Sequence, residues 1–289
     1  MDISLADAIS GEGIARMVSN LDRATLVSYQ RMGTGIANDV FRVECAGDRT
    51  VVLREVRLQR ALLAAGLRTP LPLPLRSGDV VGQEGNRAFI ITEYLGESSQ
   101  RTMTEELATD FGRTLAKFHR AVAGIELNHR DWLHPAVVNQ ELDKLKPDDR
   151  PRFERLLAGT DTLFTGRLPT ANIHGDLYLG NVLAAGNRIN VIFDLETAEC
   201  NVRLLDIAQS AMNVAETTRM PMIRAGVLVL DGYAALEKVA SDERSALPLA
   251  LRYTATASAI WLHNVGSPRG EIQLGLAASV DRLASRSSG

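Results

Sequence analysis

The segment 172–196 constrains the fold of this chain more than any other part of its sequence. It is a short island of strand-forming residues in a half of the chain where helical patterns dominate. Gly186-Asn187 at its centre is a good two-residue turn, because both residues tolerate positive φ. We therefore predict a β-hairpin in which, counting outward from the turn, Asn181 lies opposite Ile192. Asp194 follows on the same face as Ile192, so Asn181 and Asp194 should emerge together at the open end of the hairpin.

Three oxygen-bearing side chains should meet at this open end. Asp176 lies in the loop that leads into the first strand, within the run His174-Gly175-Asp176. One amide oxygen and two carboxylates are the hard ligands that Mg²⁺ prefers. By average residue frequencies, His-Gly-Asp with Asn at this offset arises by chance in on the order of one in a thousand chains of this length. The segment therefore predicts a magnesium-dependent site, with an ordinary Asx turn as the alternative for Asp176.

The rest of the chain divides into a strand-rich front and a helical rear. Alternating prolines in the segment 69–74 exclude a helix there and hold the chain extended. A small, polar stretch that begins at Gly96 is typical of a linker, so we expect two domains, residues 1–95 and 96–289. The front part is predicted to form strands at Val40–Glu44, Thr50–Leu53 and Arg87–Tyr94 and a short helix at Arg57–Ala65.

A long amphipathic helix is predicted directly after the linker. Thr102 stands three residues before Glu105, which is the spacing of a capping box and marks the start of a helix. This helix should end near Gly124. Its apolar residues recur at spacings of three and four, which places them on one face that packs into the core. They are Leu107, Phe111, Leu115, Phe118 and Val122.

Composition and charge exclude several classes of protein. Apolar residues make up 45% of the 289 residues and charged residues 23%, which is ordinary for a globular protein and too apolar for a disordered one. With 32 basic and 35 acidic side chains the net charge is -3, so no general attraction for nucleic acid or an anionic membrane is expected. The two cysteines, Cys45 and Cys200, fit a reducing compartment. We expect a cytoplasmic protein that acts on something small.

The hairpin motif resembles a known family. His174-Gly175-Asp176, with Asn181 five residues later and an aspartate after the hairpin, looks like the catalytic and metal-binding loops of the aminoglycoside phosphotransferase and choline kinase superfamily. The segments 62–70 and 205–208 are most similar in pattern to bacterial type II homoserine kinases. The resemblance implies an α+β, two-lobed protein-kinase-like fold. A small antiparallel-sheet lobe, residues 1–95, would bind the nucleotide, and a larger helical lobe, residues 96–289, would carry the catalytic and metal-binding loops and the acceptor site.

The resemblance also implies a role for each residue of the motif. Asp176 would orient the attacking hydroxyl and take its proton, and Asn181 and Asp194 would hold Mg²⁺ against the phosphates of ATP. His174 would brace the loop by hydrogen bonding. Asp206 would fasten the loop through backbone amides, or alternatively cap the helix that follows it. Candidates for contact with the acceptor or a second metal ion are Tyr178 and Glu196, although an exposed carboxylate is an equal interpretation of Glu196.

The nucleotide contacts are expected in the front part of the chain. Gly33 and Gly35 would let bare backbone donors approach the phosphates, although an ordinary hairpin loop explains them equally well. Arg54 stands where the wider fold usually places a lysine on the phosphates, and a guanidinium also grips phosphate. The backbone at Glu93 and Leu95 would meet a purine where the two lobes join.

These interpretations predict an ATP- and Mg²⁺-dependent kinase. Its acceptor would be a hydroxyl group of a small metabolite, with a homoserine-like amino acid or an amino alcohol favoured by the resemblance. Two alternatives use the same residues: an antibiotic phosphotransferase of the aminoglycoside type, and a catalytically weak nucleotide-binding pseudokinase. We expect a monomer or homodimer whose partners are small molecules, not nucleic acids or membranes.

Overall fold

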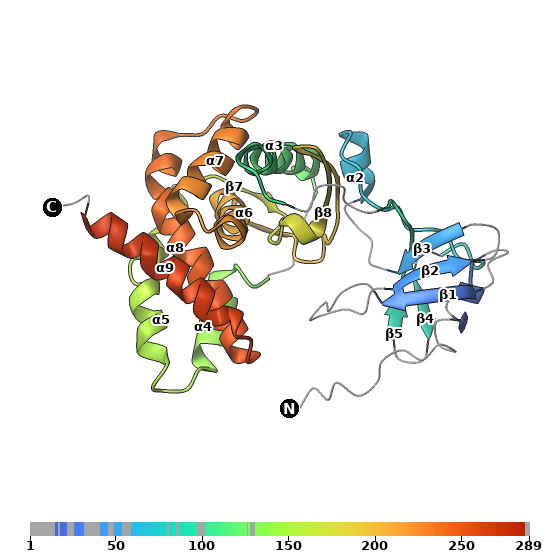
Figure 1. Cartoon of the computed structure of the whole chain (residues 1–289), viewed down its shortest axis with the longest axis horizontal. Coiled ribbons are helices and arrows are strands. Elements are labelled where there is room, and N and C mark those ends of the chain that lie inside the picture. Colours follow the sequence, from blue (N-terminus) through green and yellow to red (C-terminus); the bar gives the residue numbers. More distant parts are fainter. Residues whose placement is uncertain are drawn as a thin grey trace. The chain divides into compact units, whose positions relative to one another are not determined.

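The computed structural model describes residues 15, 16, 18–21, 26–31, 41–45, 49–53, 59–79, 81–84, 87–96, 102–125, 127 and 131–286 (Figure 1). Contacts divide the chain into two compact units. The strand-rich unit comprises residues 1–60 and 69–97, and the helical unit comprises residues 61–68 and 98–289. Helices and small antiparallel sheets together make this an α+β protein.

The strand-rich unit is built on an antiparallel sheet with the strand order β1-β2-β3-β6. The predicted strands at Val40–Glu44 and Thr50–Leu53 are confirmed as β2 and β3. The prediction of one strand at Arg87–Tyr94 is wrong: Ile90 separates β5, which pairs with β4, from β6, which pairs with β3. The predicted strand is interrupted at Ile90 because the residues before it and the residues after it pair with different strands. The strands are β1 (Leu26–Arg31), β2 (Phe41–Cys45), β3 (Arg49–Leu53), β4 (Gly82–Glu84), β5 (Arg87–Phe89) and β6 (Ile91–Glu93).

The proline-rich segment 69–74 is extended, as predicted, and covers the remaining edge of β6. Between Pro70 and Pro74 only the two leucines have an N–H to donate. Leu73 N donates to Ile91 O at 2.7 Å, and Glu93 N donates to Leu71 O at 3.1 Å. The prolines thus alternate with leucines whose backbone groups bond to β6.

The short helix α2 (Gln59–Ala64) lies within the predicted span, and Gly66, with a φ of 77°, follows its end. Its end is a Schellman motif, because Leu67 N donates to Leu62 O and Gly66 N donates to Leu63 O, both at 2.9 Å. The chain continues to Arg68, whose carbonyl accepts a 3.0 Å hydrogen bond from Ile192 N. This bond attaches the helical unit's first segment to the hairpin that the sequence singled out.

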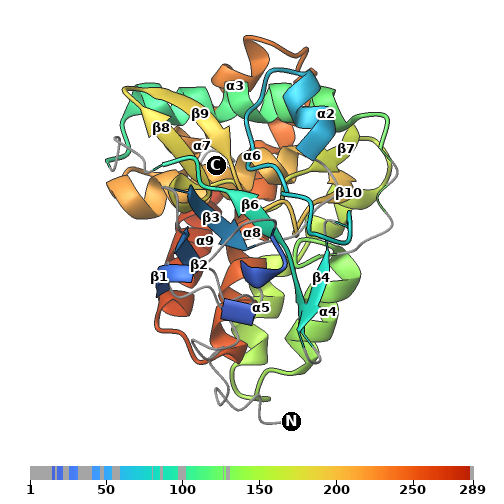
Figure 2. The same ribbon diagram turned by 90° about the vertical axis from the view of Figure 1, so that its right-hand side faces the viewer.

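The helical unit contains two small two-stranded sheets beside its helices (Figures 1 and 2). One sheet pairs β7 with β10, and the other is the β8–β9 hairpin, which lies beside α3. Its elements are α3 (Glu105–Val122), α4 (Pro135–Asp143), α5 (Arg150–Leu157), η1 (Thr160–Phe164), β7 (Thr170–Ile173), η2 (Leu179–Asn181), β8 (Val182–Ala185), β9 (Arg188–Ile192), β10 (Glu199–Val202), α6 (Arg203–Thr218), α7 (Met222–Ala234), α8 (Ser241–Asn264) and α9 (Arg269–Arg286).

Helix α3 supplies much of the core, as its apolar spacing predicted. The five residues of the predicted face, from Leu107 to Val122, are each at most 1% exposed. The predicted capping box is wrong: the N-cap is Thr104 and not Thr102, and the Thr104 side chain accepts a 3.1 Å hydrogen bond from Leu107 N. Both positions are threonines, so residue type does not distinguish them. The N-cap is Thr104 because the backbone changes from extended to helical there.

Two polar contacts hold the β8–β9 hairpin against α3. Asp110, which is 4% exposed, accepts a 2.8 Å hydrogen bond from Ile189 N. Near the turn, Thr104 Oγ1 donates to Asn187 Oδ1 at 2.8 Å. Both ends of the hairpin are therefore fixed, because Ile192 is bonded to Arg68 at the other end.

None of the helices within the described ranges combines the length and the apolar character that crossing a membrane requires.

Helices α3 and α7 cross closely because each contributes a glycine at the crossing. A Cβ atom at Gly112 would lie 1.9 Å from Val229 O, and one at Gly232 would lie 1.9 Å from Thr109 O. Backbone atoms cannot retreat as the end of a side chain can. The two helices therefore need glycine at both positions.

We expect Gly112→Ala to destabilise the protein by about 3 kcal/mol or more, because the methyl group overlaps backbone. Gly275→Ala is the matched control, since this α9 glycine has nothing within 4 Å of the added Cβ. It should raise stability by about 0.5–1 kcal/mol through helix propensity. Thermal and urea unfolding of both variants measure the difference. Equal stabilities would show that the crossing is looser than described.

Candidate active site

The loop that carries the His-Gly-Asp motif leaves strand β7 at its last residue, Ile173. Strand β7 is held by antiparallel pairing with β10, in which Ile173 lies opposite Glu199. Gly175 has a φ of 80°, and a Cβ there would lie 2.8 Å from Thr197 O. Thr197 Oγ1 in turn donates to His174 O at 2.7 Å. The motif needs glycine at this position for both its backbone conformation and its contact with the segment before β10.

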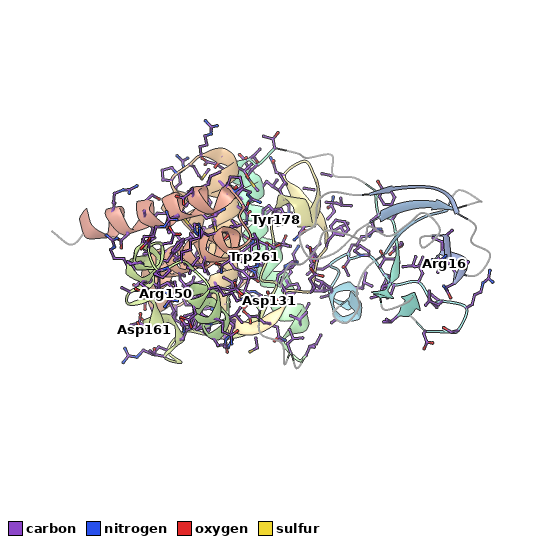
Figure 3. The ribbon with its side chains drawn as sticks, turned by 90° about the horizontal axis from the view of Figure 1, so that it is seen from below. Arg16, Asp131, Arg150, Asp161, Tyr178 and Trp261 are labelled. Atoms are coloured by element: carbon purple, nitrogen blue, oxygen red, sulfur yellow. The ribbon has the colours of Figure 1, made fainter. Side chains whose placement is uncertain are left out.

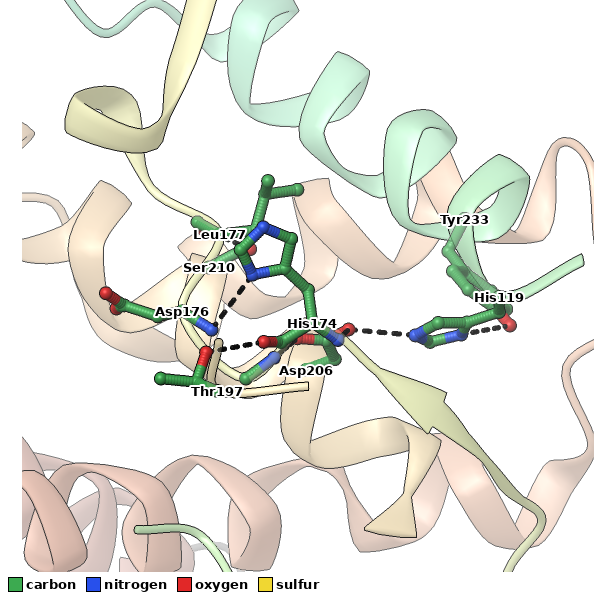
Figure 4. A network of polar contacts seen from close by, with 9 residues as sticks. His119, His174, Asp176, Leu177, Thr197, Asp206, Ser210 and Tyr233 are labelled. Atoms are coloured by element: carbon green, nitrogen blue, oxygen red, sulfur yellow. Dashed lines mark hydrogen bonds and ion pairs between the residues drawn. The ribbon is translucent and has the colours of Figure 1, made fainter. Parts of the chain in front are cut away.

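Asp206 anchors the backbone of this loop (Figure 4). Its carboxylate is fully buried and accepts from His174 N at 2.7 Å, from Gly175 N at 2.9 Å and from His119 Nε2 at 2.8 Å. Burial favours the neutral acid, but the hydrogen bonds from His119 and from the amide of His174 outweigh it and lower the pKa of Asp206. Asp206 thus lies where the sequence expected it, as a partner of the loop's amides.

A second buried contact orients His119. The Asp206 carboxylate can only accept, so His119 Nε2 is the donor in that bond. In the neutral ring, Nδ1 then accepts from the hydroxyl of Tyr233, 3.0 Å away. Burial raises the pKa of Tyr233 to about 12, which keeps this hydroxyl protonated. The chain Tyr233–His119–Asp206 therefore connects α7 and α3 to the loop.

His174 braces two segments of the site. One ring nitrogen, Nε2, donates to Phe193 O at 2.8 Å, and the other, Nδ1, accepts from Asp176 N at 3.3 Å. These two contacts require the neutral ring, and burial lowers the pKa of His174 in agreement with that. The ring also packs against Phe118 of α3, with 5.4 Å between the ring centroids.

The carboxylate of Asp176 is held at both of its oxygens. Asn181 Nδ2 donates to Asp176 Oδ2 at 3.1 Å and to the main-chain oxygen of Asp176 at 2.9 Å. Gln209 Nε2, from α6, donates to Asp176 Oδ1 at 2.8 Å. Two amide groups from different elements therefore fix the orientation of this carboxylate.

The electrostatic surroundings of Asp176 favour its protonated form. Burial raises the pKa of Asp176 from 3.8 to about 8, and the negative charge of Asp194 adds to that effect. The hydrogen bond from Asn181 acts in the opposite direction. A carboxyl group with a pKa near neutrality is suited to accept a proton during a reaction.

The structure brings Asn181 and Asp194 to the open end of the hairpin, but by a different register from the predicted one. A bulge between Leu183 and Ala184 shifts the pairing, so Ile192 lies opposite Val182 and not opposite Asn181. Phe193 N instead donates to Asn181 O at 2.8 Å. Asp194 lies beyond the strand with a φ of 63°, so its direction comes from this left-handed turn and not from strand alternation.

The residues at this end fit a cation that is shared with a phosphorylated ligand. Among the described residues, no three His, Cys, Asp or Glu side chains are grouped so that they alone would hold a metal ion. Mg²⁺, however, is commonly bound through one or two protein oxygens together with phosphate oxygens. Because the Asn181 amide nitrogen donates to Asp176, its Oδ1 is the atom left to face a cation, and Asp194 lies close enough for its charge to raise the pKa of Asp176.

The expected nucleotide residues are less completely described. Gly33, Gly35 and Arg54 lie outside the described residues. Glu93 ends β6 in the strand-rich unit, where its side chain accepts from Leu71 N at 3.4 Å. Leu95 follows it and is partly exposed.

The candidate acceptor residues Tyr178 and Glu196 both border the motif. The Tyr178 ring lies over Gly180, since a Cβ there would meet the ring at 2.5 Å. Glu196 is partly exposed, two residues beyond Asp194. Asp131, labelled with Tyr178 in Figure 3, belongs to the segment before α4 and adds to the negative field at Asp176.

Two of the residues that the sequence interpretation missed contact the loop from other elements. Trp132 Nε1 donates to Gly175 O at 3.1 Å, and no local pattern indicates that contact. Gln209 was detectable in principle, because it follows Asp206 by three residues on a helix and so shares its face.

Comparisons of the whole chain with known proteins find relatives among phosphotransferases. The model of the phosphotransferase enzyme family matches residues 28–241. The homoserine kinase of Sinorhizobium fredii (strain NBRC 101917 / NGR234) is 28% identical over 279 residues, covering 88% of this chain and 86% of that protein. The homoserine kinase of Granulibacter bethesdensis (strain ATCC BAA-1260 / CGDNIH1) is 26% identical over 281 residues, covering 88% of both chains.

Solved structures show the same fold at low identity. A microcompartment-associated aminopropanol kinase superposes with a TM-score of 0.71 at 17% identity, covering 94% of this chain and 96% of that one. The amicoumacin kinase hAmiN, in complex with AMP-PNP, Ca²⁺ and Ami, gives 0.70 at 15% identity, covering 96% and 94%. The fold is therefore that of kinase-like phosphotransferases.

The raised pKa of Asp176 predicts how stability changes with pH. Unfolded, this carboxyl ionises near pH 4, whereas in the fold it keeps its proton to about pH 8. Its stabilising contribution is therefore complete below about pH 4 and is lost as pH rises towards 8. Asp176→Asn removes this dependence, and its side chain can bond to Gln209 if the Gln209 amide turns over.

We expect the stability of Asp176→Asn relative to the unaltered protein to rise between pH 5 and pH 8, at up to about 1.4 kcal/mol per pH unit. Thermal unfolding of both proteins in chelator, without nucleotide, measures this difference. Parallel stability curves across that range would contradict the raised pKa.

Proposed function

This chain belongs to the phosphotransferase enzyme family, and we propose that it transfers a phosphoryl group from ATP to a hydroxyl of a small amino acid or amino alcohol. The observation that carries the proposal is the convergence of Asp176, Asn181 and Asp194 at one end of the β8–β9 hairpin. These are the residue types that phosphoryl transfer needs for positioning and for charge stabilisation.

Asp176 is the residue that we assign to the acceptor hydroxyl. Its oxygens are held in place by two amides, and its pKa near neutrality allows it to take up the hydroxyl proton as the O–P bond forms. Because the transition state of phosphoryl transfer is loose, orientation of the hydroxyl matters more than the strength of the base. His174 and Asp206 contribute by holding the loop that carries Asp176.

Asn181 and Asp194 are the residues that we assign to Mg²⁺. Asn181 Oδ1 and the Asp194 carboxylate would hold it, and the bound cation supplies neutralisation of the phosphate charge of ATP. Glu196, two residues beyond Asp194, is placed to reach a second cation or the acceptor.

The nucleotide side of the proposal falls on residues 1–95, and the acceptor side on residues 96–289. Backbone donors of a glycine-containing turn suit the phosphates, a guanidinium suits their charge, and main-chain groups suit the purine. We assign these roles to Gly33 and Gly35, to Arg54, and to Glu93 and Leu95, respectively.

A homoserine-like acceptor is the first choice. Curated relatives that cover 88% of this chain are homoserine kinases, at 25–28% identity, and a structural neighbour is an aminopropanol kinase. Both names describe small molecules with a hydroxyl and an amino group. Tyr178, beside Asp176 in the chain, would border such an acceptor.

We expect Asp176→Asn to lower kcat for phosphoryl transfer by about 10³-fold, because the hydroxyl loses its proton acceptor. The variant should keep its fold and its affinity for MgATP. Asp148→Asn, which makes the same change at an exposed aspartate, is the control and should leave kcat within twofold. A coupled ADP-release assay measures both. Near-native kcat in Asp176→Asn would remove Asp176 from the reaction.

A panel of acceptors tests the substrate class. We expect kcat/KM for homoserine or an aminopropanol to exceed that for an aminoglycoside or amicoumacin by at least about 10²-fold, since a site for a small acceptor must exclude larger ones. The reverse order would establish an antibiotic phosphotransferase. Failure to release ADP with any acceptor, despite nucleotide binding, would indicate a pseudokinase.

A further inference from the structure

Gln209 contacts the proposed catalytic carboxylate from a position that no motif marks. It lies on α6, three residues after Asp206, so both side chains leave the helix on the face that meets the loop. Gln209 is 1% exposed, and its Nε2 donates to Asp176 Oδ1 at 2.8 Å. Within the described residues this is the only side-chain hydrogen bond to Oδ1, while Oδ2 is bonded by Asn181.

The two amides reach the Asp176 carboxylate from different elements of the fold. Asn181 comes from the start of the hairpin, and Gln209 comes from α6. One bond would leave the carboxylate group able to rotate about its Cβ–Cγ bond. Two bonds at different oxygens fix the plane of the group, and hence the direction of the lone pair that an acceptor hydroxyl would meet.

We propose that Gln209 is a positioning residue that fixes the plane of the Asp176 carboxylate for the acceptor hydroxyl. The inference rests on the proposed function. The geometry supports it: Gln209 Nε2, the group of this side chain that can donate, bonds to Oδ1 of Asp176, the oxygen that Asn181 does not hold.

The competing explanation is that Gln209 has a purely structural role, such as the one that its neighbour Ser210 has. Ser210 Oγ donates to Leu177 O at 2.8 Å and so supports the backbone of the loop, not the carboxylate. The Gln209 side chain, in contrast, makes no hydrogen bond to the loop backbone in the described part of the chain. Its Oε1 is buried without a hydrogen-bond partner there, so the fold gains little from that half of the amide.

The chain offers a matched control in Gln273 of α9. Gln273 is also 1% exposed, its Nε2 donates to a carboxylate oxygen of Glu216 at 2.7 Å, and its Oε1 is likewise buried without a partner among the described residues. Glu216 lies seven residues beyond Gln209, about 10 Å along α6. The two glutamines therefore have the same burial and the same kind of contact but face different carboxylates.

Gln209→Met and Gln273→Met remove the amide while keeping the length of the side chain. We expect kcat of Gln209→Met to fall about 10- to 100-fold with the KM for MgATP unchanged. Gln273→Met should keep kcat within twofold, and both should shift the melting temperature by similar amounts. Gln209→Leu, which also lacks a donor and adds no charge beside Asp176, should lose about as much kcat and replaces the methionine variant if that one does not fold.

A double-variant cycle separates positioning from loss of structure. In the Asp176→Asn background, Gln209→Met should lower the residual kcat by less than about twofold, because the group that it orients is absent. A full further loss there, an unchanged kcat in Gln209→Met alone, or an equal loss in Gln273→Met would each overturn the positioning role. Unaltered kcat in Asp176→Asn would instead overturn the proposed function, so the two failures are distinguishable.

Discussion

The buried carboxylate of Asp206 is the interaction on which the rest of the site depends. A charged group without solvent is tolerated only when hydrogen bonds satisfy it, and here the donors are two loop amides and His119. Because those amides belong to His174 and Gly175, the same contacts that satisfy Asp206 also set the path of the backbone into Asp176. The position of the backbone that carries the proposed catalytic carboxylate thus follows from the burial of a different carboxylate.

Helices α3 and α6 both position residues of this site. Helix α3 contributes His119 to the Asp206 cluster and Asp110 to the hairpin, while its apolar face forms the core. Helix α6 contributes Asp206 to the loop backbone and Gln209 to the Asp176 carboxylate. Each helix therefore links core packing to site geometry, and a displacement of either would move the loop and the hairpin relative to each other.

Much of this arrangement follows from patterns within short stretches of sequence. The face of α3 was predictable because apolar periodicity reflects burial directly, and the β8–β9 hairpin because Gly186-Asn187 specifies a tight turn. The bulge at Leu183 was not predictable, since it depends on how the hairpin lies against α3 and Arg68. The split of the predicted strand at Ile90 has a similar origin, because its two halves find partners far apart in the sequence.

The sequence by itself indicated the kind of chemistry: Asp176 precedes the hairpin and Asn181 and Asp194 flank it, so a hairpin turning at Gly186-Asn187 brings them towards one end. Only the tertiary structure decided how they are aimed. The left-handed turn at Asp194, the bonds from Asn181 and Gln209 to Asp176, and the contact of Trp132 with Gly175 join residues that no local pattern connects. The physical reason is that a side chain's type is a local property, whereas its direction and its pKa depend on which distant groups bury it and bond to it.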